Sequence, residues 1–123
     1  MNDADKTFLR DLLAAPGTSA CESKPAAVWR ERATSMDAAV STDSYGNSFA
    51  TFNPNGAIKV MLAGHVDEIG LIITYIDEHG FLYFSGVGGW DSQQLVGQRV
   101  RVVGYKSELV GVNGKKPIHL MKR

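Results

Sequence analysis

The sequence predicts an α/β fold, with helices in the first third of the chain and short strands over the second half. Apolar residues recur at helical spacing within the first 35 residues. The run from Ile58 to Ala63 is nearly all apolar, which is typical of a strand buried on both faces of a sheet. From Ile69 onward, β-branched runs alternate with glycine-rich turns, a texture that predicts hairpins or a small barrel.

Two helices are expected before residue 36. The first covers about Asp5 to Ala14, and Pro16 and the following glycine end it. The second covers about Glu22 to Ser35, and either Ser19 or Ser23 is suited to cap its N-terminus.

The strands are expected at six places, separated by turn residues. The segment Asn53-Pro54-Asn55-Gly56 predicts a hairpin turn in front of the buried strand. The segment Gly86 to Trp90 is too rich in glycine for the interior of a strand. The expected strands are Ser48–Phe52, Ile58–Ala63, Ile69–Ile76, Phe81–Phe84, Leu95–Val103 and Glu108–Val112.

The composition excludes several classes of partner and location. Thirteen basic residues balance thirteen acidic ones, so nothing favours a nucleic acid or a membrane surface as partner. The single cysteine, Cys21, excludes an internal disulfide framework and favours a reducing cytoplasm. No apolar run approaches the roughly 20 residues of a membrane span, and the N-terminus lacks the apolar core of a signal peptide. A cytoplasmic protein is therefore expected.

His65 and Asp67 form the most informative pattern in the chain. They directly follow the predicted buried strand, and ligands of α/β sheets collect beyond the carboxyl ends of strands. Residues two apart in extended chain share a side, so the carboxylate can accept the second N–H of the imidazole and fix its tautomer. Such an imidazole suits zinc or cobalt. From spacing alone, however, a lone histidine is more often an ordinary surface or hydrogen-bonded residue than a metal ligand.

Seven segments, in order, resemble the glutamyl aminopeptidase and tetrahedral aminopeptidase family of two-metal peptidases, some members of which carry an endoglucanase label. Each segment is a weak signal, and their common order over nearly the whole chain is a strong one. The segments are Leu12-Leu13 with Pro16–Glu22, Asp43–Asn47, Ala63–Gly70, Gly80–Leu82, Val87–Trp90, Leu95–Val100 and Gly111–Leu120.

The resemblance implies a fold, a domain division and an activity. It implies that residues 1–67 are the N-terminal part of a zinc-peptidase-type α/β catalytic domain. Residues 68–123 are then part of an inserted, small β-barrel-like domain used for oligomerisation. The implied activity is removal of N-terminal residues from peptides by an enzyme with two divalent metals per site, zinc or cobalt. His65 is the implied metal ligand, and Asp67 is the implied catalytic carboxylate that orients it.

The resemblance also implies that this chain holds only part of the site. In the family, the bridging aspartate, the general-base glutamate and the other ligands come from a later stretch. The acidic residues after Asp67 do not match those motifs and are expected to be solvated; they are Asp77, Glu78, Asp91 and Glu108. The isolated chain is therefore expected to be inactive, unless a complementing C-terminal chain completes it. A non-catalytic oligomerisation or regulatory remnant is the alternative.

A few other residues are of types that can carry a function. Trp90 is expected to anchor the β-rich half rather than to recognise a ligand. Cys21 has no cationic neighbour in sequence that would activate it. His79 is expected at the surface of a turn, and His119 in a structural role. Ala20 stands where the family prefers Gly, which matters if that position needs positive φ, and Val66 stands where it prefers Met.

Overall fold

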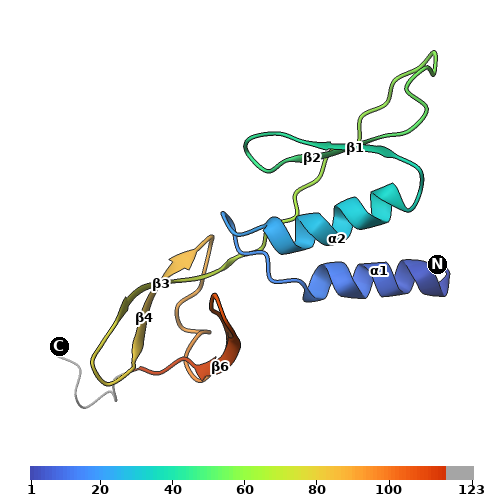
Figure 1. The fold of residues 1–123 in the computed structure, drawn as a ribbon. Coiled ribbons are helices and arrows are strands. Elements are labelled where there is room, and N and C mark those ends of the chain that lie inside the picture. The colour runs from blue at the N-terminus through green and yellow to red at the C-terminus, as the bar shows by residue number, and fades with distance from the viewer. Residues whose placement is uncertain (116–123) are drawn as a thin grey trace. The chain divides into compact units, whose positions relative to one another are not determined.

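The computed structural model describes residues 1–115, which divide between a compact unit, Met1–Gly88, and a second unit that begins at Gly89. The predicted domain boundary at residue 67 stays a prediction. Together the described residues are α/β, as expected (Figure 1). The elements are α1 (Asp3–Ala14), α2 (Ser23–Thr34), β1 (Ala39–Thr42), β2 (Ser48–Thr51), β3 (Gly70–Ile76), β4 (Leu82–Val87), β5 (Arg99–Val103) and β6 (Glu108–Val112).

Both predicted helices are confirmed, but their N-termini differ from the prediction. Helix α1 begins two residues earlier because the side chain of Asn2 caps it, accepting from the Asp5 N–H at 2.8 Å. The predicted cap of α2 is wrong. Glu22 occupies the cap position and makes no side-chain capping bond, while Ser23 is already helical. The hydroxyl of Ser19 bonds to a carboxylate instead, as described below.

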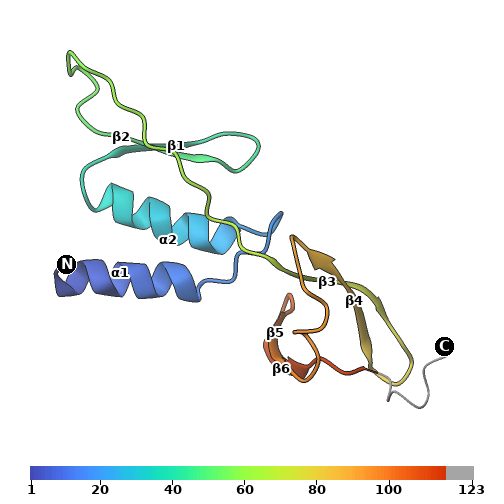
Figure 2. The ribbon, with the colours of Figure 1, turned by 180° about the vertical axis from the view of Figure 1, so that it is seen from behind.

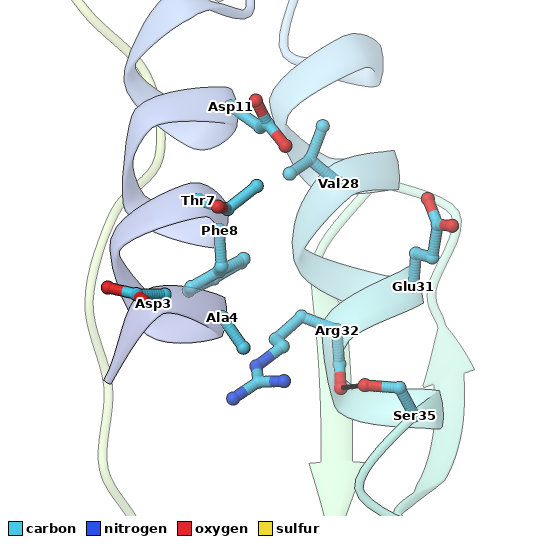
Figure 3. Close-up of a pocket in the computed structure, with 9 residues that line it drawn as sticks. All are labelled: Asp3, Ala4, Thr7, Phe8, Asp11, Val28, Glu31, Arg32 and Ser35. Carbon is cyan, nitrogen blue, oxygen red and sulfur yellow. Dashed lines mark hydrogen bonds between the residues drawn. The ribbon is translucent and has the colours of Figure 1, made fainter. Parts of the chain in front are cut away.

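The two helices lie side by side in both views (Figures 1 and 2). Between them is an open groove of about 520 Å³, to which α1 contributes Phe8 and α2 contributes Val28 and Arg32 (Figure 3). The Arg32 guanidinium lies 5.9 Å from the centre of the Phe8 ring and 2.6 Å from Asp5. Both charged groups are partly exposed, so this ion pair contributes at most about 1 kcal/mol.

Strands β1 and β2 form an antiparallel hairpin that contacts α2. The sequence predicts the turn between them but not β1, whose four residues include only one large apolar side chain. Asp43 organises the turn: its carboxylate accepts from the backbone N–H of Tyr45 at 3.0 Å and from that of Asn47 at 2.9 Å. A further bond from the Asn47 side chain, 2.8 Å long, is the main cause that lowers the pKa of Asp43 below its usual value.

The strand predicted from Ile58 to Ala63 is absent, and this prediction is wrong for the structure. The stretch between β2 and β3 is drawn as coil (Figure 1) and is solvent-exposed, with Val60 79% and Leu62 94% accessible. The turn at Asn53 forms, but it closes no hairpin. A strand must give its backbone N–H and C=O groups to neighbours. Each strand described here pairs with one other strand, and none lies beside this segment.

Strands β3 and β4 form the second antiparallel hairpin, from the Gly70–Val87 pair to the Ile76–Leu82 pair. The predicted second strand ends at Phe84, but β4 continues for three further residues, to Val87, despite its glycine. Asp77 is not the solvated residue that was predicted. It is half-buried, and its Oδ1 atom accepts from the backbone N–H of His79 at 3.0 Å and of Phe81 at 2.8 Å, which closes the turn.

Strands β5 and β6 pair antiparallel over five residues each. The bounds of β6 are those that the sequence predicts. The predicted start of β5 at Leu95 is four residues too early, because Leu95 to Gln98 form a turn closed by a bond from the Gln98 N–H to the Leu95 carbonyl at 3.1 Å. Asn113 anchors that turn. Its backbone carbonyl accepts from Gly97 at 2.8 Å, and its N–H donates to Gln98 at 2.9 Å. Each of the three hairpins is a separate two-stranded sheet within residues 1–115, and the predicted barrel-like arrangement stays a prediction.

Ala20 adopts a left-handed backbone conformation, with φ of 73°. Its methyl group disfavours this conformation, and glycine does not. We expect Ala20→Gly to stabilise the chain by about 1 kcal/mol in urea unfolding. The control is Ala27→Gly on the exposed face of α2, which should destabilise by about 1 kcal/mol. A loss of stability in Ala20→Gly would show that the strain is absent.

Candidate functional site

The N-terminal loop lies against the segment that carries the His65-Asp67 pattern. Thr18 and Glu68 form a parallel bridge. The Glu68 N–H donates to the Gly17 carbonyl at 2.9 Å, and the Ser19 N–H donates to the Glu68 carbonyl at 3.2 Å. The Glu68 carboxylate also accepts from the Gly17 N–H at 3.2 Å. These bonds join two stretches that lie about 50 positions apart in sequence, and they fix the backbone at Glu68, the residue that follows Asp67.

Glycine is required at two positions of this junction. Gly17 is buried, and a Cβ atom there would lie 2.6 Å from the Pro25 Cγ atom. The Pro25 ring is fully buried and rigid, so it cannot move aside. At Gly70, a Cβ atom would overlap the Thr18 side chain. The close approach of the loop to the 67–70 segment therefore depends on the absence of side chains.

Substituting Gly17 by Ala should separate the loop from residue 68. We expect Gly17→Ala to cost about 1–3 kcal/mol of stability, because the new methyl group overpacks against Pro25. Gly64→Ala is the matched control, since no atom lies within 4 Å of its Cβ position; that variant should stay within about 0.5 kcal/mol of the parent. Urea unfolding measures both, and equal stability of the two variants would contradict the packing described here.

The His65 side chain meets Asp67 through its Nδ1 atom. Nδ1 lies 2.9 Å from Asp67 Oδ1 and 3.1 Å from the Asp67 carbonyl oxygen. Both partners are acceptors, so Nδ1 carries the proton and donates it. The Nε2 atom makes no hydrogen bond within residues 1–115, and the side chain is 86% exposed. The ring therefore presents a free nitrogen lone pair to solvent.

Asp67 has a partner on each carboxylate oxygen. The Ser19 hydroxyl donates to Oδ2 at 2.5 Å, while Oδ1 faces His65. The bond from Ser19, and after it the bond from His65, lower the pKa of Asp67 below its usual value, so the carboxylate is ionised at neutral pH. Sequence reasoning missed Ser19 and Glu68 because no local pattern shows that the loop meets this segment. The only indication in the sequence that Ser19 matters is that it lies in the segment from Pro16 to Glu22 that resembles the family.

None of the remaining candidates is hydrogen-bonded to this pair within residues 1–115. Cys21 is free and exposed, and His79 is an exposed turn residue as predicted, 3.7 Å from Glu78. Trp90 is 38% exposed, and its anchoring role stays a prediction. His119 lies outside the described residues. No cluster of three His, Cys, Asp or Glu side chains that could hold a metal occurs in the part of the chain that the structure describes.

Comparison with known proteins identifies the family of the chain. Residues 46–123 match the family of M42 glutamyl aminopeptidases. The chain belongs to this family. A putative aminopeptidase of Acetivibrio thermocellus is 44% identical over 72 residues, which are 58% of this chain and 21% of that protein. The lysyl aminopeptidase of Pyrococcus furiosus is 40% identical over 83 residues, 68% of this chain and 24% of that protein. The matched part of the chain thus covers less than a quarter of the length of each of these two relatives.

Solved structures of the family confirm the α/β fold. A TET aminopeptidase from the marine sediment archaeon Thaumarchaeota archaeon SCGC AB-539-E09 matches 98% of this chain and 34% of its own, with a TM-score of 0.88 and 32% identity. The Pyrococcus horikoshii TET1 peptidase, described as assembling into a tetrahedron or a large octahedral shell, matches 94% of this chain and 34% of its own. Its TM-score is 0.71, with 35% identity.

The donor set of this chain fits part of a metal site only. Nδ1 of His65 donates to the Asp67 carboxylate, which leaves Nε2 as the ring nitrogen whose lone pair could bond a metal. A catalytic zinc takes three protein ligands, and residues 1–115 bring no third group to His65. Within the same residues, no helix is long and apolar enough to cross a membrane.

Proposed function

We propose that this chain supplies one metal-ligating histidine, His65, and its orienting carboxylate, Asp67, to a metal-dependent aminopeptidase that removes N-terminal residues from peptides. The observation that carries the proposal is the protonation state that the geometry imposes on His65. Its Nδ1 atom faces two acceptors, which leaves Nε2 as a lone pair on an exposed ring. Membership of the glutamyl aminopeptidase family supports the reaction class.

The chemistry of the proposal depends on a divalent metal, with zinc or cobalt suited to imidazole. When bound, such a metal polarises the scissile carbonyl and lowers the pKa of its bound water. Asp67 acts through His65: an ionised carboxylate on Nδ1–H raises the basicity of Nε2 and holds the ring in one orientation. Two metals per complete site is the number that the resemblance implies.

The other ligands and the general base are expected from the parts of the enzyme that the relatives have and this chain lacks. The chain spans 34% of the archaeal TET aminopeptidase, which leaves two thirds of that enzyme to supply them. A second copy or a complementing chain is a further proposed partner, because TET relatives assemble into shells and large apolar side chains are exposed here. A cytoplasmic location stays a prediction.

A chimera tests this function directly. Residues 1–123 would replace the corresponding third of the archaeal TET aminopeptidase, and both the isolated chain and the chimera would be assayed with zinc or cobalt on aminoacyl-anilides. We expect no turnover by the isolated chain and turnover by the chimera. Activity of the isolated chain that is lost in His65→Ala would contradict the incomplete site. A folded but inactive chimera would favour the non-catalytic remnant.

A further inference from the structure

Ser19 contacts the His65-Asp67 pair although it lies 48 residues from Asp67 in sequence. Its hydroxyl donates to Oδ2 at 2.5 Å, and the imidazole donates to Oδ1 at 2.9 Å. The three side chains therefore form one hydrogen-bonded series, from serine through carboxylate to imidazole. The serine stands at the end of the series that is farthest from the free Nε2 atom.

The backbone holds Ser19 in place independently of its hydroxyl. Its N–H donates to the Glu68 carbonyl at 3.2 Å, and the neighbouring residue Thr18 forms the bridge with Glu68. On the other side, the Cys21 N–H donates to the Thr18 carbonyl at 2.7 Å and closes a turn. The hydroxyl is thus carried by a fixed backbone, from which it can restrain a side chain that is itself mobile.

The pair needs such a restraint because packing does not supply one. The His65 side chain is 86% exposed and that of Asp67 is 37% exposed. At an exposed carboxylate, water competes for each oxygen, so a bond to the imidazole alone leaves the Asp67 side chain free to rotate. A hydroxyl on Oδ2 fixes the plane of the carboxylate and directs Oδ1 toward the ring.

We propose that Ser19 is a positioning residue of this site. Through Asp67 it fixes the orientation of His65 and its Nδ1–H tautomer, and this keeps the Nε2 lone pair available to a divalent metal. The metal part of the inference rests on the proposed function. The tautomer part does not, because it concerns the chain without any metal.

The test is a long-range proton–nitrogen correlation spectrum of the histidine rings, recorded on the metal-free chain. The His65 signals are those that His65→Ala removes. In the parent we expect the Nδ1–H tautomer to dominate. In Ser19→Ala, we expect the ring to shift toward the Nε2–H tautomer, which free imidazole side chains prefer. Ser19→Thr retains the hydroxyl and should restore the parent signals.

Two controls separate positioning from folding. Ser23→Ala makes the same chemical change at an exposed serine whose hydroxyl makes no hydrogen bond within residues 1–115, and it should leave the His65 signals unchanged. Amide exchange of Ser19 and Glu68 reports the backbone bridge. Unchanged protection together with a changed tautomer in Ser19→Ala supports the positioning role. A tautomer that does not change, or one that changes only with loss of the bridge, would overturn it.

The consequence for metal binding is measured separately in the chimera. There, Ser19→Ala should weaken binding of zinc by about 10-fold, the lower end of the effects known for groups that orient metal ligands. Because the spectroscopic test uses no metal, the two proposals fail independently. A tautomer shift without an effect on zinc binding would leave Ser19 as the restraint of His65 and would overturn the metal part of the inference.

Discussion

Replacing His65 by Ala in the chimera should abolish aminopeptidase activity, and replacing Asp67 by Asn should lower kcat/KM by about 10- to 100-fold. The first change removes a ligand. Asp67→Asn keeps an acceptor for the His65 Nδ1–H but removes the negative charge. The NH₂ group of the asparagine cannot accept a hydrogen bond from the Ser19 hydroxyl. The basicity of Nε2 therefore falls, while the ring remains in the site.

The measurement is kcat/KM on an aminoacyl-anilide, together with the metal content of the purified protein. His79→Ala is the control, because this histidine lies exposed in the β3–β4 turn and should not affect activity or metal content. Equal metal content in His65→Ala and the parent would show that His65 is not a ligand. Activity of Asp67→Asn equal to that of the parent would exclude the proposed role of the carboxylate.

Leu62→Ala should leave the stability of the isolated chain nearly unchanged but should lower the stability of the chimera. In the isolated chain Leu62 is 94% exposed, so we expect a change within about 0.5 kcal/mol. In the chimera, the sequence pattern predicts that the run from Ile58 becomes a central strand with neighbours on both sides. The same truncation would then create a cavity that costs about 2–5 kcal/mol.

Denaturant unfolding of the parent and of Leu62→Ala, each as the isolated chain and as the chimera, measures this difference. Tyr45→Ala is the control, since Tyr45 is 92% exposed in the β1–β2 turn and should be nearly neutral in both contexts. A Leu62→Ala variant that destabilises the isolated chain by more than 2 kcal/mol would mean that the run is already packed. A neutral Leu62→Ala in the chimera would show that the pattern does not encode a buried strand.

The sequence predicts well where local chemistry decides the structure. The first helix follows from apolar spacing with a stop at Pro16. The turns at Asp43 and Asp77 follow from an Asp with a Gly three residues later. The alternation of β-branched residues likewise predicts β3 and β6. This helix, these turns and these hairpin strands each depend on contacts between residues that are near in sequence, and a pattern within one segment can predict such contacts.

The failures arise where structure depends on distant partners. The run from Ile58 has the composition of a buried strand, but within residues 1–115 no strand lies beside it, so its backbone stays unpaired. The sequence offers Ser19 as one of two possible helix caps, because no local pattern indicates its contact with Asp67, 48 residues away. The family resemblance assigned His65 and Asp67, and the structure adds which nitrogen and which oxygen meet.

The most direct test of the central claim is a crystal structure of the chimera with zinc. We predict a zinc ion bonded to the Nε2 atom of His65 at about 2.0–2.1 Å, with Nδ1 still donating to Asp67 and Asp67 still accepting from Ser19. A zinc ion bonded to Nδ1, or a zinc ion that His65 does not contact, would contradict the account.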